Sequence, residues 1–119
     1  MARVILIEDD NLVRTLLMRR MVAAGWSVTP MRDGRDLQAV MAEQPADLLV
    51  IDLGLPYIDG FALVESLRAH GHTTPVLVIS AYELPHLLES AKSTGANDVL
   101  QKPFDQEELL VRMNRLLAA

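Results

Sequence analysis

Four short strand-like runs in the chain end in side chains that could bind or transfer a phosphoryl group. The runs at 4–7, 48–51, 76–79 and 98–101 are followed, in that order, by Glu8-Asp9-Asp10, Asp52, Ser80 and Lys102-Pro103. Apolar runs of this kind are typical of strands buried on both faces of a parallel sheet. Because ligands bind at the carboxyl ends of strands in an open parallel sheet, we expect these acids, the hydroxyl and the amine to converge on one edge.

The predicted cluster of Glu8, Asp9 and Asp52 indicates a metal site. Like charges held close together raise one another's pKa or require a cation. Oxygen ligands without a nearby His or Cys favour a hard divalent ion, and a few carboxylates combined with a phosphoryl oxygen suit Mg²⁺. The backbone carbonyl of Gly54 is a further candidate ligand.

A carboxylate can also act as a nucleophile and form an aspartyl phosphate. Asp52 is the best candidate, because it is a single acid at a strand end that faces the other acids. Transfer to Asp52 would build negative charge on the phosphoryl oxygens, so catalysis would rest on positioning and charge neutralisation. The metal, the Lys102 ammonium and the Ser80 hydroxyl would supply both.

Composition limits the class of protein. The chain has 119 residues, 50% of them apolar, which predicts one domain spanning residues 1–119. A formal charge of -5 argues against a nucleic-acid-binding face, and the absence of cysteine excludes disulfides and cysteine zinc sites. No apolar run approaches the length that a membrane span needs, and residues 1–3 lack the features of a signal peptide, so we expect a cytoplasmic protein.

Helical periodicity fills the segments between the strands. Helices are predicted from about Asp10 to Gly25, around 37–41, from Phe61 to near Gly71, around 84–91, and from near Asp105; a further strand is predicted at 26–30. The alternation of strands and helices predicts an α/β fold with a single doubly wound five-stranded parallel sheet, order 2-1-3-4-5, and five helices on both faces.

Over essentially its whole length the chain resembles the CheY-like receiver domain of two-component response regulators. The matching motifs are Glu8-Asp9-Asp10, the segment 52–60 that begins with Asp52, Ser80-Ala81 and Lys102-Pro103-Phe104. The resemblance implies that Asp52 accepts a phosphoryl group from a sensor histidine kinase or a histidine phosphotransfer protein. It also implies that Asp9 binds Mg²⁺ directly with Glu8 nearby, and that Ser80 and Lys102 hold the phosphoryl oxygens. The Lys102-Pro103 peptide is commonly cis in this family.

The chain departs from the family at Val99, where an aromatic residue usually moves when the site is occupied. A valine cannot report the site in this way, and we hypothesise that Tyr82 covers the pocket or replaces part of the switch.

The surface of the fourth helix, fifth strand and fifth helix is the expected output face, for a downstream protein target or a fused output domain. Asp98 and Arg112 match a pair that joins two subunits in the transcription-factor branch of the family, which implies a phosphorylation-dependent homodimer. Leu88 stands where that branch has a basic partner, so the match is partial. If Leu84, Leu87 or Leu88 is exposed, the face would suit a more apolar partner, although core packing is expected for at least two of these leucines.

Two other classes of protein fit the sequence less well. An Asp-nucleophile phosphatase generally has a second acid two residues after the nucleophile, and Gly54 holds that position. A nucleotide or flavin carrier would need a glycine-rich loop after the first strand, where this chain has acids. The expected function is therefore a signalling module whose only chemistry is its own phosphorylation and slow dephosphorylation.

Overall fold

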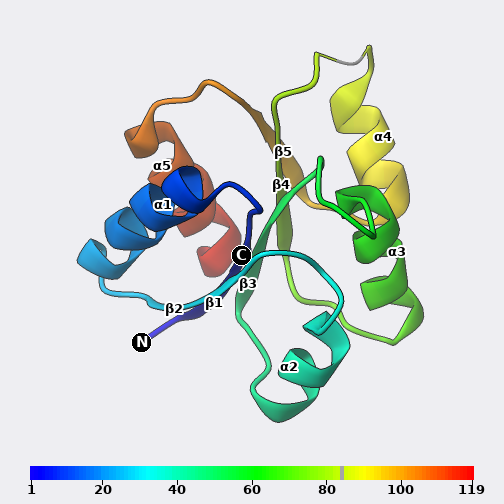
Figure 1. Cartoon of the computed structure of the whole chain (residues 1–119), viewed down its shortest axis with the longest axis horizontal. Helices are drawn as coiled ribbons and strands as arrows, with labels where there is room; N and C mark the ends of the chain where they lie inside the picture. Colours follow the sequence, from blue (N-terminus) through cyan, green and yellow to red (C-terminus); the bar gives the residue numbers. More distant parts are fainter. Residues whose placement is uncertain (84) are drawn as a thin grey trace.

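A parallel sheet of five strands, in the order β2-β1-β3-β4-β5, forms the centre of the protein (Figure 1). The structure is a computed structural model and describes residues 1–83 and 85–119. The strands are β1 (Arg3–Ile7), β2 (Ser27–Met31), β3 (Leu48–Asp52), β4 (Val76–Ser80) and β5 (Asp98–Gln101). The helices are α1 (Asn11–Ala23), α2 (Leu37–Glu43), α3 (Gly60–Ala69), α4 (Leu87–Thr94) and α5 (Gln106–Ala118). The predicted fold class and strand order are confirmed.

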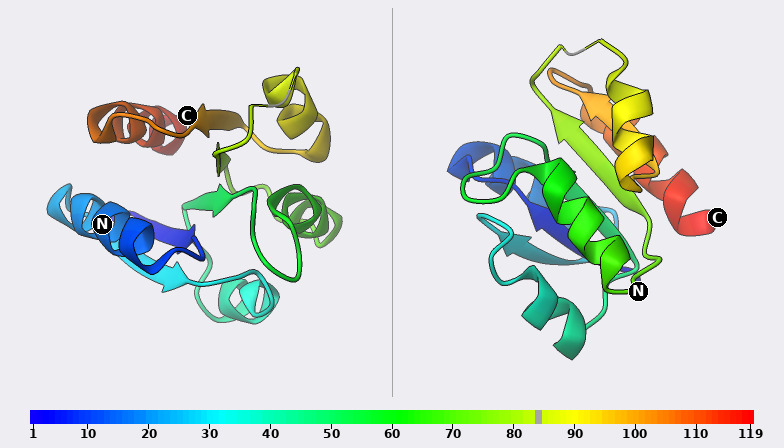
Figure 2. Two further views of the ribbon diagram at one scale, coloured as in Figure 1. Left: turned by 45° about the horizontal axis from the view of Figure 1, so that its top comes forward. Right: turned by 90° about the vertical axis from the view of Figure 1, so that its right-hand side faces the viewer.

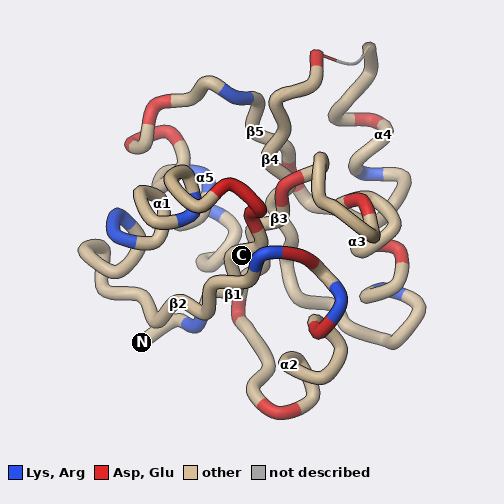
Figure 3. The backbone as a smooth tube through the Cα atoms, in the orientation of Figure 1, with Lys and Arg blue, Asp and Glu red and all other residues tan. Residues whose placement is uncertain are grey.

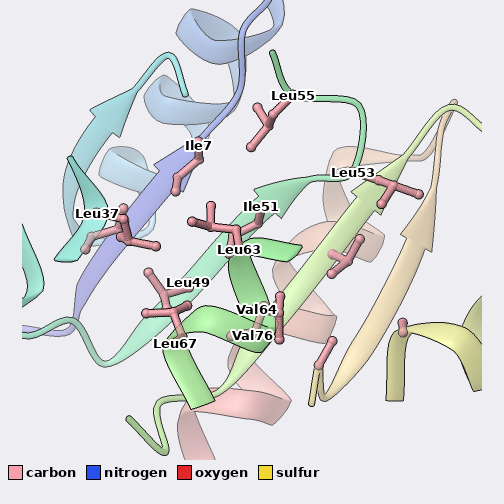
Figure 4. Packing of buried hydrophobic residues seen from close by; sticks show 14 of the residues in the cluster. Ile7, Leu37, Leu49, Ile51, Leu53, Leu55, Leu63, Val64, Leu67 and Val76 are labelled. Carbon is pink, nitrogen blue, oxygen red and sulfur yellow. The ribbon is translucent and has the colours of Figure 1, made fainter. Parts of the chain in front are cut away.

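The helices cover the two faces of the sheet, with α1 and α5 on one face and α2, α3 and α4 on the other (Figure 2). Successive residues of a strand point to opposite faces, so Leu49 and Ile51 pack under α3 while Val50 packs toward α1 and α5. Figure 4 shows the buried hydrophobic residues on the face covered by α2, α3 and α4, where Leu63 and Leu67 of α3 lie against β3. Burial of both faces explains why the central strands read as continuous apolar runs.

Aspartate side chains cap three of the helices in the described part of the chain. Asp10, Asp59 and Asp105 each accept a hydrogen bond from a backbone N–H in the first turn of α1, α3 and α5, respectively. Such caps satisfy donors that the helix itself leaves free. The caps fix the path of the chain as it leaves β1 and as it enters α3 and α5, and so help to position the strand-end side chains.

Two local predictions differ from the structure. The second strand is Ser27–Met31 rather than 26–30, a shift of one residue. The expected core packing of the leucines near the fourth helix is wrong at Leu88, which is 45% exposed, whereas Leu87 is buried. Adjacent helical residues point about 100° apart, and α4 turns Leu87 toward the sheet, which leaves Leu88 on the side that faces solvent. Leu84 lies outside the described residues.

None of the helices in the described part of the chain combines the length and the apolar character needed to cross a lipid bilayer.

Candidate acidic site at the carboxyl edge of the sheet

Three acids meet where β1 and β3 end. One carboxylate oxygen from each of Glu8, Asp9 and Asp52 lies within 4.8 Å of the other two. Glu8 and Asp52 are buried and Asp9 is exposed, so the group has a closed side and an open side. Figure 3 shows the acidic segments at the ends of these two strands, which pair directly in the sheet. The structure thus brings together the three acids that the sequence predicts to gather.

Lys102, the residue that follows β5, extends its side chain into the same site. Its Nζ lies 2.7 Å from Glu8 Oε1 and 3.5 Å from Asp52 Oδ2, and its side chain is 23% exposed. The Lys102-Pro103 peptide is cis, as the resemblance implies. The ammonium therefore contacts both buried acids and partly neutralises them.

Burial and charge shift the pKa of both members of the Glu8–Lys102 pair. The pKa of Glu8 is raised to about 7, chiefly by burial and then by the hydrogen bond and charge of Asp52, while Lys102 opposes this rise. Burial alone would lower the pKa of Lys102, but its hydrogen bond to Glu8 and the charge of Asp52 outweigh burial and raise that pKa. Burial thus favours the neutral form of Glu8, and the nearby ammonium of Lys102 partly offsets that effect.

One acceptor in this site has no protein partner. Glu8 Oε2 is buried and receives no hydrogen bond from the described residues. Leaving a buried polar oxygen unsatisfied is costly, and the cost is removed if a cation or a bound water occupies the space beside it. An orphaned carboxylate oxygen next to two further carboxylates, with oxygen as the only donor type, fits a hard divalent ion.

Tight packing fixes Asp52. The Gly54 N–H lies 3.3 Å from Asp52 Oδ1, and Asp52 is only 6% exposed. A Cβ on Gly60 would lie 2.6 Å from the backbone oxygen of Asp52, so only glycine allows the start of α3 to approach this closely. Gly54 and Gly60 thus hold the loop against the acid.

Ser80 takes part in a local turn with Tyr82. It is fully buried at the end of β4, next to β3. Its Oγ accepts a hydrogen bond of 2.9 Å from the Tyr82 N–H, and it lies 3.5 Å from the Tyr82 carbonyl oxygen. In this conformation the hydroxyl is engaged with the backbone two residues ahead. The sequence prediction placed Ser80 at this edge of the sheet but missed this local turn.

Sequence reasoning also missed Arg14. Its guanidinium donates a hydrogen bond of 2.7 Å to the Glu8 carbonyl oxygen from the first turn of α1. This contact ties the helix to the backbone of a site residue. The spacing of six residues carries no recognisable motif, so only the turn between β1 and α1 reveals it.

Asp98 and Arg112, the pair expected to join two subunits, form an ion pair with each other within the chain. Arg112 Nη1 lies 3.0 Å from Asp98 Oδ2, and Arg112 Nη2 lies 3.2 Å from Glu108 Oε1. Arg112 also donates to the Val99 carbonyl oxygen, and Val99 is partly buried against the core. The dimer through this pair therefore stays a prediction, and it requires Arg112 to change partners.

The fold and the strand-end cluster together define a doubly wound α/β domain with an acidic site at its switch point. Residues 4–114 match the family model described as response regulator receiver domain, so the chain belongs to this family of two-component signalling domains. It is 36% identical over 115 residues to response regulator MprA of Mycolicibacterium vanbaalenii, and equally similar to MprA of Mycobacterium tuberculosis. The match covers 97% of this chain and 50% of each relative, so the chain spans about half the length of these relatives.

Solved structures agree with this assignment. A putative response regulator from Chloroflexus aurantiacus superposes with a TM-score of 0.93 at 30% identity, covering 99% of this chain and 98% of that one. The chemotaxis protein CheY4 of Vibrio cholerae superposes with a TM-score of 0.90 at 29% identity, covering 98% of each chain.

Proposed function

We propose that this domain accepts a phosphoryl group on Asp52 from a phosphohistidine of a sensor histidine kinase or a histidine phosphotransfer protein, and that it signals by a changed binding surface. The observation that carries the proposal is the joint approach of Lys102 to Glu8 and to Asp52, beside an acid cluster with an orphaned oxygen. A structural ion pair alone would not require a third acid, Asp9, on the open side.

In the proposed reaction an Asp52 carboxylate oxygen forms a bond to phosphorus as the phosphorus–nitrogen bond of the donor breaks. The electron pair of that bond stays on the donor's ring nitrogen, and the ring leaves as neutral imidazole because its other nitrogen carries a proton. The Gly54 N–H beside Asp52 Oδ1 helps to hold the carboxylate in place. Lys102 lies close enough to Asp52 to form an ion pair with the new phosphoryl oxygens, and Ser80 supplies a hydroxyl from the neighbouring strand.

Glu8, Asp9 and Asp52 would hold Mg²⁺, with the Gly54 carbonyl as a further proposed ligand. When bound, the ion supplies positive charge that offsets both the acids and the incoming phosphoryl group. The protein side chains provide the orientation: the buried Glu8 anchors Lys102, and the exposed Asp9 leaves the site open to a donor.

The phosphatase alternative is less well supported by the residues around Asp52. Gly54 occupies the position where such an enzyme would have an acid to protonate a leaving group, and its N–H faces Asp52 instead. We therefore propose a binding module with slow self-dephosphorylation rather than an enzyme that turns over phosphate esters.

Mass measurement after incubation with Mg²⁺ and acetyl phosphate tests the acceptor. Wild type is expected to gain one phosphoryl group and Asp52→Asn none. Asp36→Asn is the matched control, because Asp36 is an exposed aspartate at the start of α2 and should leave uptake unchanged. Equal incorporation in wild type and Asp52→Asn would remove Asp52 as the acceptor.

The wider proposal treats residues 1–119 as one phosphoacceptor unit located in the cytoplasm, acting on a downstream protein or a fused output domain. A phosphorylation-dependent homodimer through Asp98 and Arg112 is part of it. Sedimentation of the phosphorylated protein, compared with Arg112→Ala, tests the dimer: a dimer that persists unchanged in the variant contradicts a role for this pair.

A further inference from the structure

The Tyr82 side chain lies against the loop that follows the proposed acceptor. A Cβ built on Gly54 would stand 3.2 Å from both Cε2 and Oη of Tyr82, so the ring rests directly over this glycine. Leu53, Gly54 and Tyr82 line one open groove together with Phe61 of α3. Tyr82 is 54% exposed, so the ring covers the loop without being locked in the core.

The same residue is tied to Ser80 through its backbone. The Tyr82 N–H donates to Ser80 Oγ at 2.9 Å, which closes a tight turn just after β4. The remaining contacts of the turn are weak, because Ser80 Oγ and Gln101 Nε2 lie 3.5 Å and 3.4 Å from the Tyr82 carbonyl oxygen. One hydrogen bond, accepted by a buried hydroxyl, therefore does most to fix the position of Tyr82.

These two contacts couple the site to the surface. In the described structure both hydrogen-bond contacts of the Ser80 hydroxyl are with Tyr82, and Oγ accepts the one that closes the turn. A change of the Ser80 rotamer that carries Oγ toward a group on Asp52 therefore gives up that bond. The turn can then open, and the ring is no longer held over Gly54. A phosphoryl group also adds bulk and charge beside Gly54, whose N–H already contacts Asp52 Oδ1.

We infer that Tyr82 is the positioning residue that reports the state of Asp52, because its backbone holds the Ser80 hydroxyl and its ring covers Gly54. The inference rests on the proposed function. It assigns the signal to the segment between β4 and α4, and it does not need an aromatic side chain at position 99. Occupation of the site moves the Tyr82 ring off Gly54 and exposes the groove beneath it.

The chain offers a direct probe, because Tyr57 and Tyr82 are its only tyrosines. In a Tyr57→Phe background, 3-fluorotyrosine labels position 82 alone, and a single fluorine resonance reports its surroundings. Mg²⁺ with beryllium trifluoride serves as the phosphoryl analogue. We expect the resonance to shift and to become more accessible to a soluble paramagnetic quencher, and we expect no shift in Asp52→Asn.

Two variants test the coupling itself. Ser80→Ala removes the acceptor of the Tyr82 N–H bond, so its resonance should lie near the shifted position without ligand and should lose most of the ligand-induced change. Gly54→Ala places a methyl group against the ring and should displace the resonance in the same direction. Agreement of either variant with this expectation supports the coupling, and an unshifted resonance in both overturns it.

Phosphoryl uptake measured by mass on the same labelled protein separates the two proposals. Uptake at Asp52 with an unchanged fluorine resonance would overturn the role of Tyr82 and leave the proposed function intact. Absence of uptake would overturn both.

Discussion

The Lys102 ammonium lies closer to Glu8 than to Asp52, with Nζ 2.7 Å from Glu8 Oε1 and 3.5 Å from Asp52 Oδ2. A phosphoryl group on Asp52, as proposed, would therefore compete with Glu8 for the same cation. That competition would make Glu8, which is fully buried, part of the energetics of phosphorylation as well as of stability.

Removing the ammonium should destabilise the metal-free protein in a pH-dependent way. Lys102→Met keeps a long apolar side chain but leaves two buried acids without their cation, which should lower the free energy of unfolding by on the order of 3 kcal/mol at about pH 8. The loss should be smaller at about pH 5, where Glu8 is protonated. Urea unfolding measures both values. Lys92→Met on the exposed side of α4 is the control, and equal losses at the two pH values would contradict the account.

The raised pKa of Glu8 predicts a falling stability curve. The folded protein keeps the Glu8 proton up to about pH 7, whereas the unfolded chain releases it near the ordinary glutamate pKa of 4.5. Between these values the folded state binds more protons, so the free energy of unfolding decreases as pH rises. In a chelator, Glu8→Gln should flatten this decrease by up to about 1.4 kcal/mol per pH unit. A variant curve parallel to that of wild type would show that another group titrates.

Magnesium binding should depend on the exposed acid of the cluster. Asp9→Asn removes one of three carboxylates whose oxygens lie within 4.8 Å of each other, and should weaken Mg²⁺ binding by at least about tenfold. Glu65→Gln, at an exposed position of α3, leaves the site intact and should bind as wild type does. Isothermal titration calorimetry of the three proteins decides between one ion shared by the three carboxylates and three carboxylates that bind no common ion.

Arg68 predicts a stability effect far from the site. Its guanidinium donates to the Gly95 carbonyl oxygen, and to the carbonyl oxygens of His72 and Thr74, and so joins the ends of α3 and α4 to the start of β4. Arg68→Ala leaves these partly buried carbonyls without their donor and should cost roughly 2 to 4 kcal/mol in thermal or urea unfolding. Arg115→Ala, at an exposed position of α5, should cost much less. Phosphoryl uptake at Asp52 should persist in both variants.

The sequence predicted the sheet and the strand-end acids because each depends on a local pattern. An apolar run such as Val4 to Ile7 can be buried on both faces only in a central strand, and the residue after it then falls at the carboxyl edge. The same argument places Asp52, whose strand lies beside β1. The family motifs then identified which acids belong together.

The remaining details depend on contacts that no local pattern specifies. The side of α4 that faces the sheet decides that Leu87 is buried and Leu88 exposed. The choice of Arg112 between a partner subunit and its own Asp98 depends on the distance between β5 and α5. The bond between Ser80 and the Tyr82 N–H depends on a rotamer, which the sequence does not record.

The capping aspartates limit the places where a cation can bind among the acids of this region. Asp10, Asp59 and Asp105 each accept a hydrogen bond, through one carboxylate oxygen, from a backbone N–H of the helix that follows. A cation would compete with that hydrogen bond to recruit any of them, whereas the buried Glu8 Oε2 accepts no hydrogen bond from the described residues. Among the described residues, the acids at this edge of the sheet therefore offer a cation one group of carboxylates, formed by Glu8, Asp9 and Asp52.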